Sequence, residues 1–123
     1  MQPNTPTTPF PHERLDAYRV ALDLAVATKA LSDRIPRGYR DLADQLLRCG
    51  TAPVLLVAEG ANRTSAAMKR QRFTEARGEC GEAAAAIELG LRLGFFPSAD
   101  AAAASTLASR LAAMLTRLMV RWG

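Results

Sequence analysis

The chain has 123 residues, enough for one domain with a buried core. Apolar residues make up 49% and charged residues 23%, which excludes a disordered chain, and aromatic residues at 6% argue against a β-sandwich. The net charge of +4 fits an acidic partner, because most of the basic residues are arginines, whose guanidinium groups bind phosphate or carboxylate oxygens in pairs. A genome rich in G and C would produce the same excess of arginine.

The first eleven residues contain four prolines and three threonines. Proline lacks a backbone donor, so we predict a flexible tail at 1–11, followed by a single domain at 12–123. The chain starts without an apolar leader segment, and no run approaches the ~18 apolar residues of a membrane span. We therefore expect a cytoplasmic protein.

The spacing of apolar residues predicts a first helix over 13–35. One stripe along this helix is formed by Leu15, Tyr18, Leu22, Ala25 and Val26, and a second by Val20, Leu24, Ala27 and Leu31. Together the two stripes are wider than one helix pair requires, which predicts that copies of the chain associate. Pro36 ends the helix, because the residue before a proline avoids the helical conformation.

A second helix is expected over 39–61, with an inner face formed by Leu42, Leu46, Cys49 and Leu56. Pro53 lies inside it, where its ring crowds the preceding turn, so we predict a kink and no break. Gly60 to Asn62 should end the helix, and Thr64 or Ser65 should cap the next one.

The third helix is predicted over 65–93, with an inner face formed by Phe73, Ala76, Cys80, Ala83, Ile87 and Leu91. Gly78 and Gly81 lie inside it and cost about 1 kcal/mol each relative to alanine. We therefore expect a neighbouring helix to approach closely at these two glycines. Gly94 should follow the helix end, and Phe95 to Pro97 should form the turn.

The fourth helix is predicted from Ser98, as N-cap, to Arg121. The residues expected to face inward are Leu107, Leu111, Met114, Leu118 and Trp122, with Leu115 and Met119 beside them. Four long helices with short connections predict an all-α, up-and-down antiparallel four-helix bundle. Tyr39, Phe95 and Phe96 fall at the turns, where they either cap one end of the bundle or touch a neighbouring subunit.

Residues for catalysis are missing from this pattern. His12 is the single histidine, there is no Glu-x-x-His motif, and the glycines build no phosphate-binding loop. We therefore assign no catalytic, cofactor-binding or metal residues and expect the chain not to be an enzyme. Cys49 and Cys80 either form a disulfide or, as their apolar neighbours favour, are two buried thiols.

Basic residues are concentrated in one stretch of the sequence. Between residues 62 and 77 lie Arg63, Lys69, Arg70, Arg72 and Arg77, opposed by a single acidic residue, Glu75. The last helix adds Arg110, Arg117 and Arg121, which share one helix face. If the two faces are neighbours, they form a surface for the phosphate backbone of RNA or DNA; alternatively, they are solvated faces without a ligand. Without a stacking platform of aromatic residues, binding should be salt-sensitive.

The order of these motifs resembles the four-helix bundle proteins first known as products of 23S ribosomal RNA intervening sequences. The resemblance covers residue 12 to the C-terminus and is carried by the following segments: Leu15-x-x-Tyr18-x-x-Ala21-Leu22, Leu42-x-x-Gln45-Leu46-Leu47-Arg48-Cys49, Ala58-Glu59-Gly60, Phe73-x-x-Ala76-Arg77-Gly78-Glu79-Cys80-x-Glu82 and Leu93-Gly94-Phe95. The chain departs from the family where relatives have a serine, a proline and an asparagine at alternate positions. Here those positions hold Ala52, Val54 and Leu56, and the proline is shifted to Pro53.

This family is similar in fold to the accessory variability determinant of diversity-generating retroelements, a homopentamer that associates with a reverse transcriptase and nucleic acid. The family has no established enzymatic activity. The resemblance implies a ring-like homo-oligomer, as a pentamer, with a basic surface; it does not imply that this protein works with a reverse transcriptase. We therefore expect a homo-oligomeric module that binds nucleic-acid backbone. The alternative is a scaffold that binds another protein through its alanine-rich grooves without nucleic acid.

Overall fold

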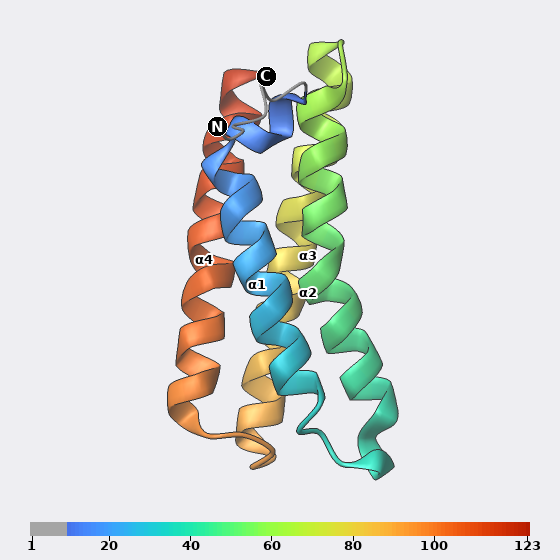
Figure 1. The fold of residues 1–123 in the computed structure, drawn as a ribbon, viewed down its shortest axis with the longest axis vertical. Helices are drawn as coiled ribbons and strands as arrows, with labels where there is room; N and C mark the ends of the chain where they lie inside the picture. Colours follow the sequence, from blue (N-terminus) through green and yellow to red (C-terminus); the bar gives the residue numbers. More distant parts are fainter. Residues whose placement is uncertain (1–9) are drawn as a thin grey trace, which may run out of the picture.

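The computed structural model describes residues 10–123 and contains four long helices that run alternately up and down (Figure 1). The elements are the short 3-10 helices η1 (Pro11–Arg14) and η2 (Arg37–Tyr39) and the α-helices α1 (Asp16–Ser32), α2 (Arg40–Asn62), α3 (Ala66–Arg92) and α4 (Ser98–Arg121). The predicted all-α, up-and-down four-helix bundle is confirmed. Residues 1–9, most of the predicted tail, lie outside the described residues. Within 10–123, no helix is both long and apolar enough to cross a membrane.

Each helix packs mainly against two neighbours, so α1 lies diagonally across the bundle from α3. The core has two parts. The part nearer η1 includes Leu24, Val57, Phe73, Leu111 and Leu115, and the other part includes Leu31, Leu46, Ile87, Phe96 and Ala104. We call the end formed by η1, the α2–α3 turn and the end of α4 the terminal end. The opposite end is formed by the other two turns, where the rings of Tyr39 and Phe95 lie 4.7 Å apart.

The first helix is shorter than predicted, because Leu15 is extended and separates η1 from α1. Two contacts hold η1 against the bundle: the side-chain amide of Asn62 donates to Nδ1 of His12 over 2.8 Å, and the His12 ring lies edge-on to Tyr18. At its other end α1 stops at Ser32, and the chain continues in tight turns up to the proline. The sequence pattern could not separate these turns from the helix, because their apolar spacing is similar.

The predicted helix ends and caps are confirmed in part. The Ser65 hydroxyl accepts from the Met68 backbone N–H over 3.1 Å, as expected of an N-cap. Gly94 has a φ of 82°, the left-handed conformation predicted after α3. Pro53 is buried inside α2, which continues through it. The assignment of Ser98 as N-cap was wrong: Pro97 is the N-cap, in extended conformation and without a side-chain bond.

The two stripes predicted on α1 differ in burial. Val20, Leu24 and Leu31 of the second stripe are buried in the core. By contrast, Leu22 and Val26 of the first stripe are 41% and 73% exposed. The reason is that α1 packs between α2 and α4, and this direction buries the side of the helix away from these two residues.

Glycines let two helices approach closely, but not where the sequence suggested. A Cβ at Gly50 would overlap the side chain of Thr28, so this glycine sets the contact between α1 and α2. At Gly78 and Gly81, by contrast, such a Cβ would meet no described atom within 4 Å beyond the adjoining residues and the backbone of its own helix. The expected close approach at these two glycines is therefore wrong within one protomer, because both lie on the exposed side of α3.

Cys49 and Cys80 are both buried and free, so the disulfide alternative is not realised. The inner face of α3 carries Cys80 into the core beside Phe73. Burial raises the pKa of the Cys80 thiol to about 12 from its ordinary value of 9.0. The thiol is thus a small apolar core group that stays protonated.

We predict that Gly50→Ala destabilises the protein by about 1–3 kcal/mol, because the new methyl group has no space beside Thr28. Urea unfolding measures the loss. The swapped double variant, Thr28→Gly with Gly50→Ala, restores the space and should be more stable than the sum of the two single changes. Additive losses would show that this contact does not limit the packing.

We also predict that the Cys80 thiol makes stability decrease at high pH. Above pH 9 only the unfolded chain loses this proton, because the folded pKa is about 12. The contribution is complete below pH 9 and is lost toward pH 12, by about 1.4 kcal/mol per pH unit. Unfolding of the protein and of Cys80→Ala at several pH values isolates the effect. A difference between the two that stays constant with pH would contradict it.

Candidate nucleic-acid interface

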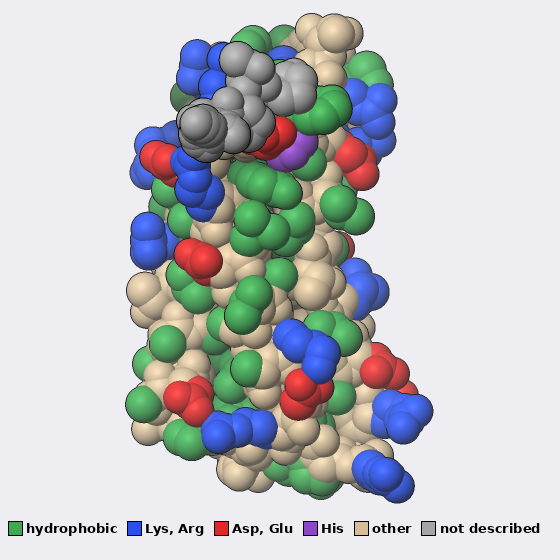
Figure 2. Space-filling view, viewed as in Figure 1, with side chains coloured by type: hydrophobic (Ala, Val, Ile, Leu, Met, Phe, Trp, Pro, Cys, Tyr) green, Lys and Arg blue, Asp and Glu red, His purple; other side chains and the backbone are tan. Residues whose placement is uncertain are grey.

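Most of the predicted basic residues come together at the terminal end of the bundle. Arg63 follows α2, Lys69 and Arg70 begin α3, and Arg117 and Arg121 lie in the last turns of α4. Figure 2 shows Lys and Arg side chains gathered at this end, over the end of α4 and near the α2–α3 turn. Residues far apart in the sequence are therefore neighbours here, because the chain passes this end at η1, at the α2–α3 turn and at the end of α4.

Two of the predicted residues are used inside the fold. The Lys69 ammonium donates to the backbone oxygens of Gly60 and Ala61, over 3.4 and 2.9 Å, and so binds the C-terminus of α2. Arg72 lies between two carboxylates, with Nε 3.1 Å from Glu59 and Nη1 2.9 Å from Glu75. Its buried Nε approaches Glu59 without hydrogen-bond geometry. The charge of Arg72 is thus neutralised, and Arg72 is a poor candidate for binding phosphate.

Arg70 and Arg77 project from α3 toward α4 and stay exposed. Arg70 Nε donates to the Met119 backbone oxygen over 3.3 Å, and Arg77 Nε donates to the Thr116 hydroxyl over 2.6 Å. Neither has a carboxylate partner within residues 10–123. These bonds use one nitrogen of each guanidinium, so the other donors can bind a ligand.

The arginines of α4 face a different side from those of α3. Arg117 and Arg121 line a hollow of about 240 Å³ beside the start of α1, whereas Arg70 and Arg77 lie on the side of α3. Arg110 lies two helical turns before Arg117 and extends the exposed basic row along α4. The predicted single surface is therefore a band of charge on both sides of α4 that is densest at the terminal end.

The structure adds Arg14, which the sequence analysis did not select. Arg14 is adjacent in sequence to Glu13, so the local charge is balanced and gives no signal. η1 places it at a second hollow, of about 230 Å³, together with Lys69, Arg121 and Trp122. The Lys69 ammonium and the Arg121 guanidinium lie 5.1 and 5.6 Å from the centre of the Trp122 ring, a range in which cations are attracted to indole.

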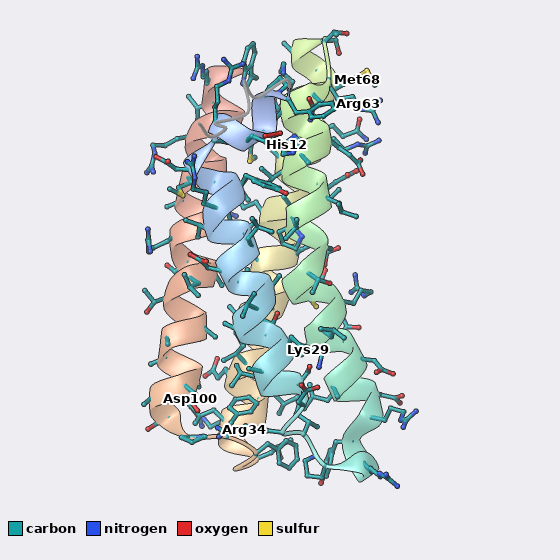
Figure 3. The ribbon with its side chains drawn as sticks, in the orientation of Figure 1. His12, Lys29, Arg34, Arg63, Met68 and Asp100 are labelled. Carbon is teal, nitrogen blue, oxygen red and sulfur yellow. The ribbon has the colours of Figure 1, made fainter. Side chains whose placement is uncertain are left out.

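The opposite end of the bundle has a different charge pattern. Arg34 and Asp100 form an ion pair of 2.7 Å that joins the α1–α2 turn to the start of α4, and Lys29 pairs with Asp33 (Figure 3). Paired charges of this kind neutralise each other and leave little electrostatic potential for a ligand. Arg37 and Arg40 also lie at this end, next to Asp41 and Asp44 in the sequence, so the excess of positive charge is greater at the terminal end.

A group of potential metal ligands lies between α2 and α3. Atoms of Cys49, Glu79 and Glu82 lie within 4.8 Å of one another. Arg48 already binds both carboxylates, over 3.3 and 3.1 Å, and the Cys49 thiol donates to the backbone oxygen of Gln45. Burial raises the pKa of this thiol, which favours its protonated form. The arrangement is that of an ion-pair network between two helices.

Comparison with known proteins places the chain in a family. Residues 13–117 match the family model described as 23S rRNA-intervening sequence protein. None of the curated proteins compared with the chain matches it. A crystal structure from Bacteroides thetaiotaomicron, described as a protein with unknown function from the S23 ribosomal protein family, is similar in fold, with a TM-score of 0.79 and 18% identity over 84% of this chain and 97% of that one. Because the model matches most of the sequence, the chain belongs to the 23S rRNA-intervening sequence protein family.

Proposed function

We propose that this protein is a non-enzymatic, homo-oligomeric module that binds the phosphate backbone of RNA or DNA at the terminal end of its bundle. One observation carries the proposal. Five arginines at this end have no carboxylate partner within residues 10–123, namely Arg14, Arg63, Arg70, Arg117 and Arg121. The acidic residues nearby are largely paired, since Asp16 binds Arg19 and Glu59 binds Arg72.

The kind of nucleic-acid contact follows from these side chains. Guanidinium groups bind phosphate oxygens in pairs and do so without reading the bases. Trp122 offers no free stacking surface of the usual kind, because Lys69 and Arg121 both lie against its ring. Binding should therefore depend on charge and release counterions, and it should show little preference for sequence. The family name, which refers to 23S ribosomal RNA, makes RNA the first ligand to test.

The homo-oligomer is supported by apolar side chains that the protomer leaves exposed. Val26, Leu55 and Val120 are each about two-thirds to three-quarters exposed. Removing such side chains from water is favourable, at about 25 cal/mol for each Å². We propose that the assembly is a pentamer, because the family is similar in fold to the homopentameric accessory variability determinant of diversity-generating retroelements. An assembly of this kind would repeat the basic end in every copy and strengthen weak contacts to one nucleic acid.

We predict that the triple variant Arg14→Gln, Arg117→Gln and Arg121→Gln weakens binding to single-stranded RNA and makes it less sensitive to salt. The slope of log affinity against log salt should fall by about 2, because each phosphate contact contributes about 0.7 for a single strand. Fluorescence anisotropy over a range of salt concentrations measures both quantities.

The matched control removes three charges from the opposite end, as Arg37→Gln, Arg40→Gln and Arg92→Gln. Its salt slope should stay much closer to that of the unchanged protein. If the two triple variants lower the salt slope equally, RNA binding depends only on the net charge of the protein, which would contradict a site at the terminal end. Binding of a protein partner that survives nuclease and high salt, with no RNA bound even at low salt, would replace the proposal by the scaffold function.

A further inference from the structure

A hollow lies over the end of the hydrophobic core at the terminal end of the bundle. It is the hollow of about 230 Å³ that contains Arg14, Lys69 and Arg121, and we call it the end hollow. The other residues that line it are all apolar: Pro11, Leu15, Ala61, Phe73, Leu118 and Trp122. Phe73 is 1% exposed and belongs to the core, so the core itself forms the floor of the hollow. In Figure 1, η1 lies beside the end of α4, and the end hollow is where these two segments meet α2 and α3.

The charges around the end hollow are all positive. No acidic residue lines it, and within residues 10–123 neither Arg14 nor Arg121 has a carboxylate partner. The Lys69 ammonium has three donors and uses two of them on Gly60 and Ala61, so one is left for a ligand. An apolar floor with cations around it suits a ligand that has an apolar body and a negative charge.

The volume of the end hollow limits the size of that apolar body. An apolar cavity of about 150 Å³ holds a benzene molecule, and drug-sized ligands occupy about 300–1,000 Å³. The end hollow, at about 230 Å³, lies between these limits. A nucleobase is a flat system of one or two rings and is slightly larger than benzene. One base therefore fits the hollow, whereas a larger cofactor does not.

The place of the end hollow within the basic surface favours a base that belongs to a bound strand. Arg14 and Arg121, two of the arginines proposed to bind phosphate, lie at this hollow. A base is joined to its phosphate through one sugar, so a strand on these arginines brings its bases to the hollow. Single strands are commonly bound with their bases unstacked and placed against protein side chains. A free face of Trp122 is not required, because the hollow removes apolar surface of the base from water on several sides.

The neighbouring hollow is a poorer place for a nucleotide. It has about 240 Å³, lies beside the start of α1 and shares Leu15, Leu118 and Arg121 with the end hollow. It also contains the carboxylate of Asp16, which repels phosphate. The ion pair of Asp16 with Arg19 is exposed, and exposed pairs of this kind are weak. The absence of a lining carboxylate thus selects the end hollow.

We infer that the end hollow binds one unstacked nucleobase of an RNA or DNA strand, with the phosphate of the same nucleotide on Arg14 or Arg121. This inference rests on the proposed function and adds a contact to a base that backbone binding alone does not include. The lining side chains form no pattern of donors and acceptors that distinguishes one base from another, so any base can enter. A free nucleotide has the same chemistry, and the experiment separates it from a strand.

The experiment compares two strands that carry the same charge. One is a single-stranded RNA of uridines, which stack weakly on one another, and the other is an abasic strand with the same number of phosphates. The uridine strand should bind about tenfold more tightly, within the range that a base contact contributes. This ratio should persist as salt is raised, because both strands release similar numbers of counterions. Equal affinities for the two strands would overturn the inference.

A variant that fills the end hollow locates the contact. Leu118→Phe adds a ring to the hollow and keeps every cation, so the preference for the uridine strand should disappear. The matched control is Leu107→Phe, the same change about three turns earlier in α4, also at a partly buried leucine and outside both hollows. This control should keep the preference. A preference that survives Leu118→Phe would place the base elsewhere and overturn the inference. If circular dichroism shows that Leu118→Phe is unfolded, Leu15→Phe fills the hollow from its other side.

Tryptophan fluorescence separates this inference from the proposed function. Trp122 is the single tryptophan of the chain, so its emission reports on the end hollow. The emission should change with the uridine strand and much less with the abasic strand. Salt-sensitive binding of both strands with equal affinity would refute the base site alone. If neither strand binds at low salt while uridine monophosphate changes the emission, both the proposed function and this inference are wrong, and the hollow is a site for a free nucleotide.

Discussion

The bundle depends on close approach between helices that present small side chains. Where Thr28 of α1 meets Gly50 of α2, no room remains for one methyl group, and where Gly60 meets Phe73, a Cβ would lie 2.6 Å from the ring. Alanines fill many of the remaining buried positions on α1, α3 and α4. Contacts between small side chains bury little apolar area per residue. The stability of the bundle therefore depends more on the correct packing of a few large side chains.

The terminal end is built around the end of α2. The last turn of a helix has backbone oxygens without partners inside the helix, and Lys69 at the start of α3 binds two of those of α2. The same lysine lies against Trp122, which covers the end of the core. Part of the positive charge is thus consumed by structure. The arginines that remain are at the rim, where phosphate can reach them without disturbing the core.

By itself, the sequence determined the number, type and approximate bounds of the four helices. Turn residues and long apolar periodicities are local signals, which is why Ser65 and Gly94 were predicted in the correct roles. The sequence also located the excess of basic residues near the start of the third helix, because the sum of charges along a segment needs no structure.

Only the tertiary structure decided which of these residues face a partner. The two apolar stripes of α1 cover so much of the helix that either of them could face the core. The packing of α1 between α2 and α4 leaves Leu22 and Val26 exposed. Arg72 was neutralised by Glu59, a residue of another helix, while Arg14 joined the basic end from a segment of balanced charge. Burial and pairing depend on residues distant in the sequence, so the local pattern could not reveal them.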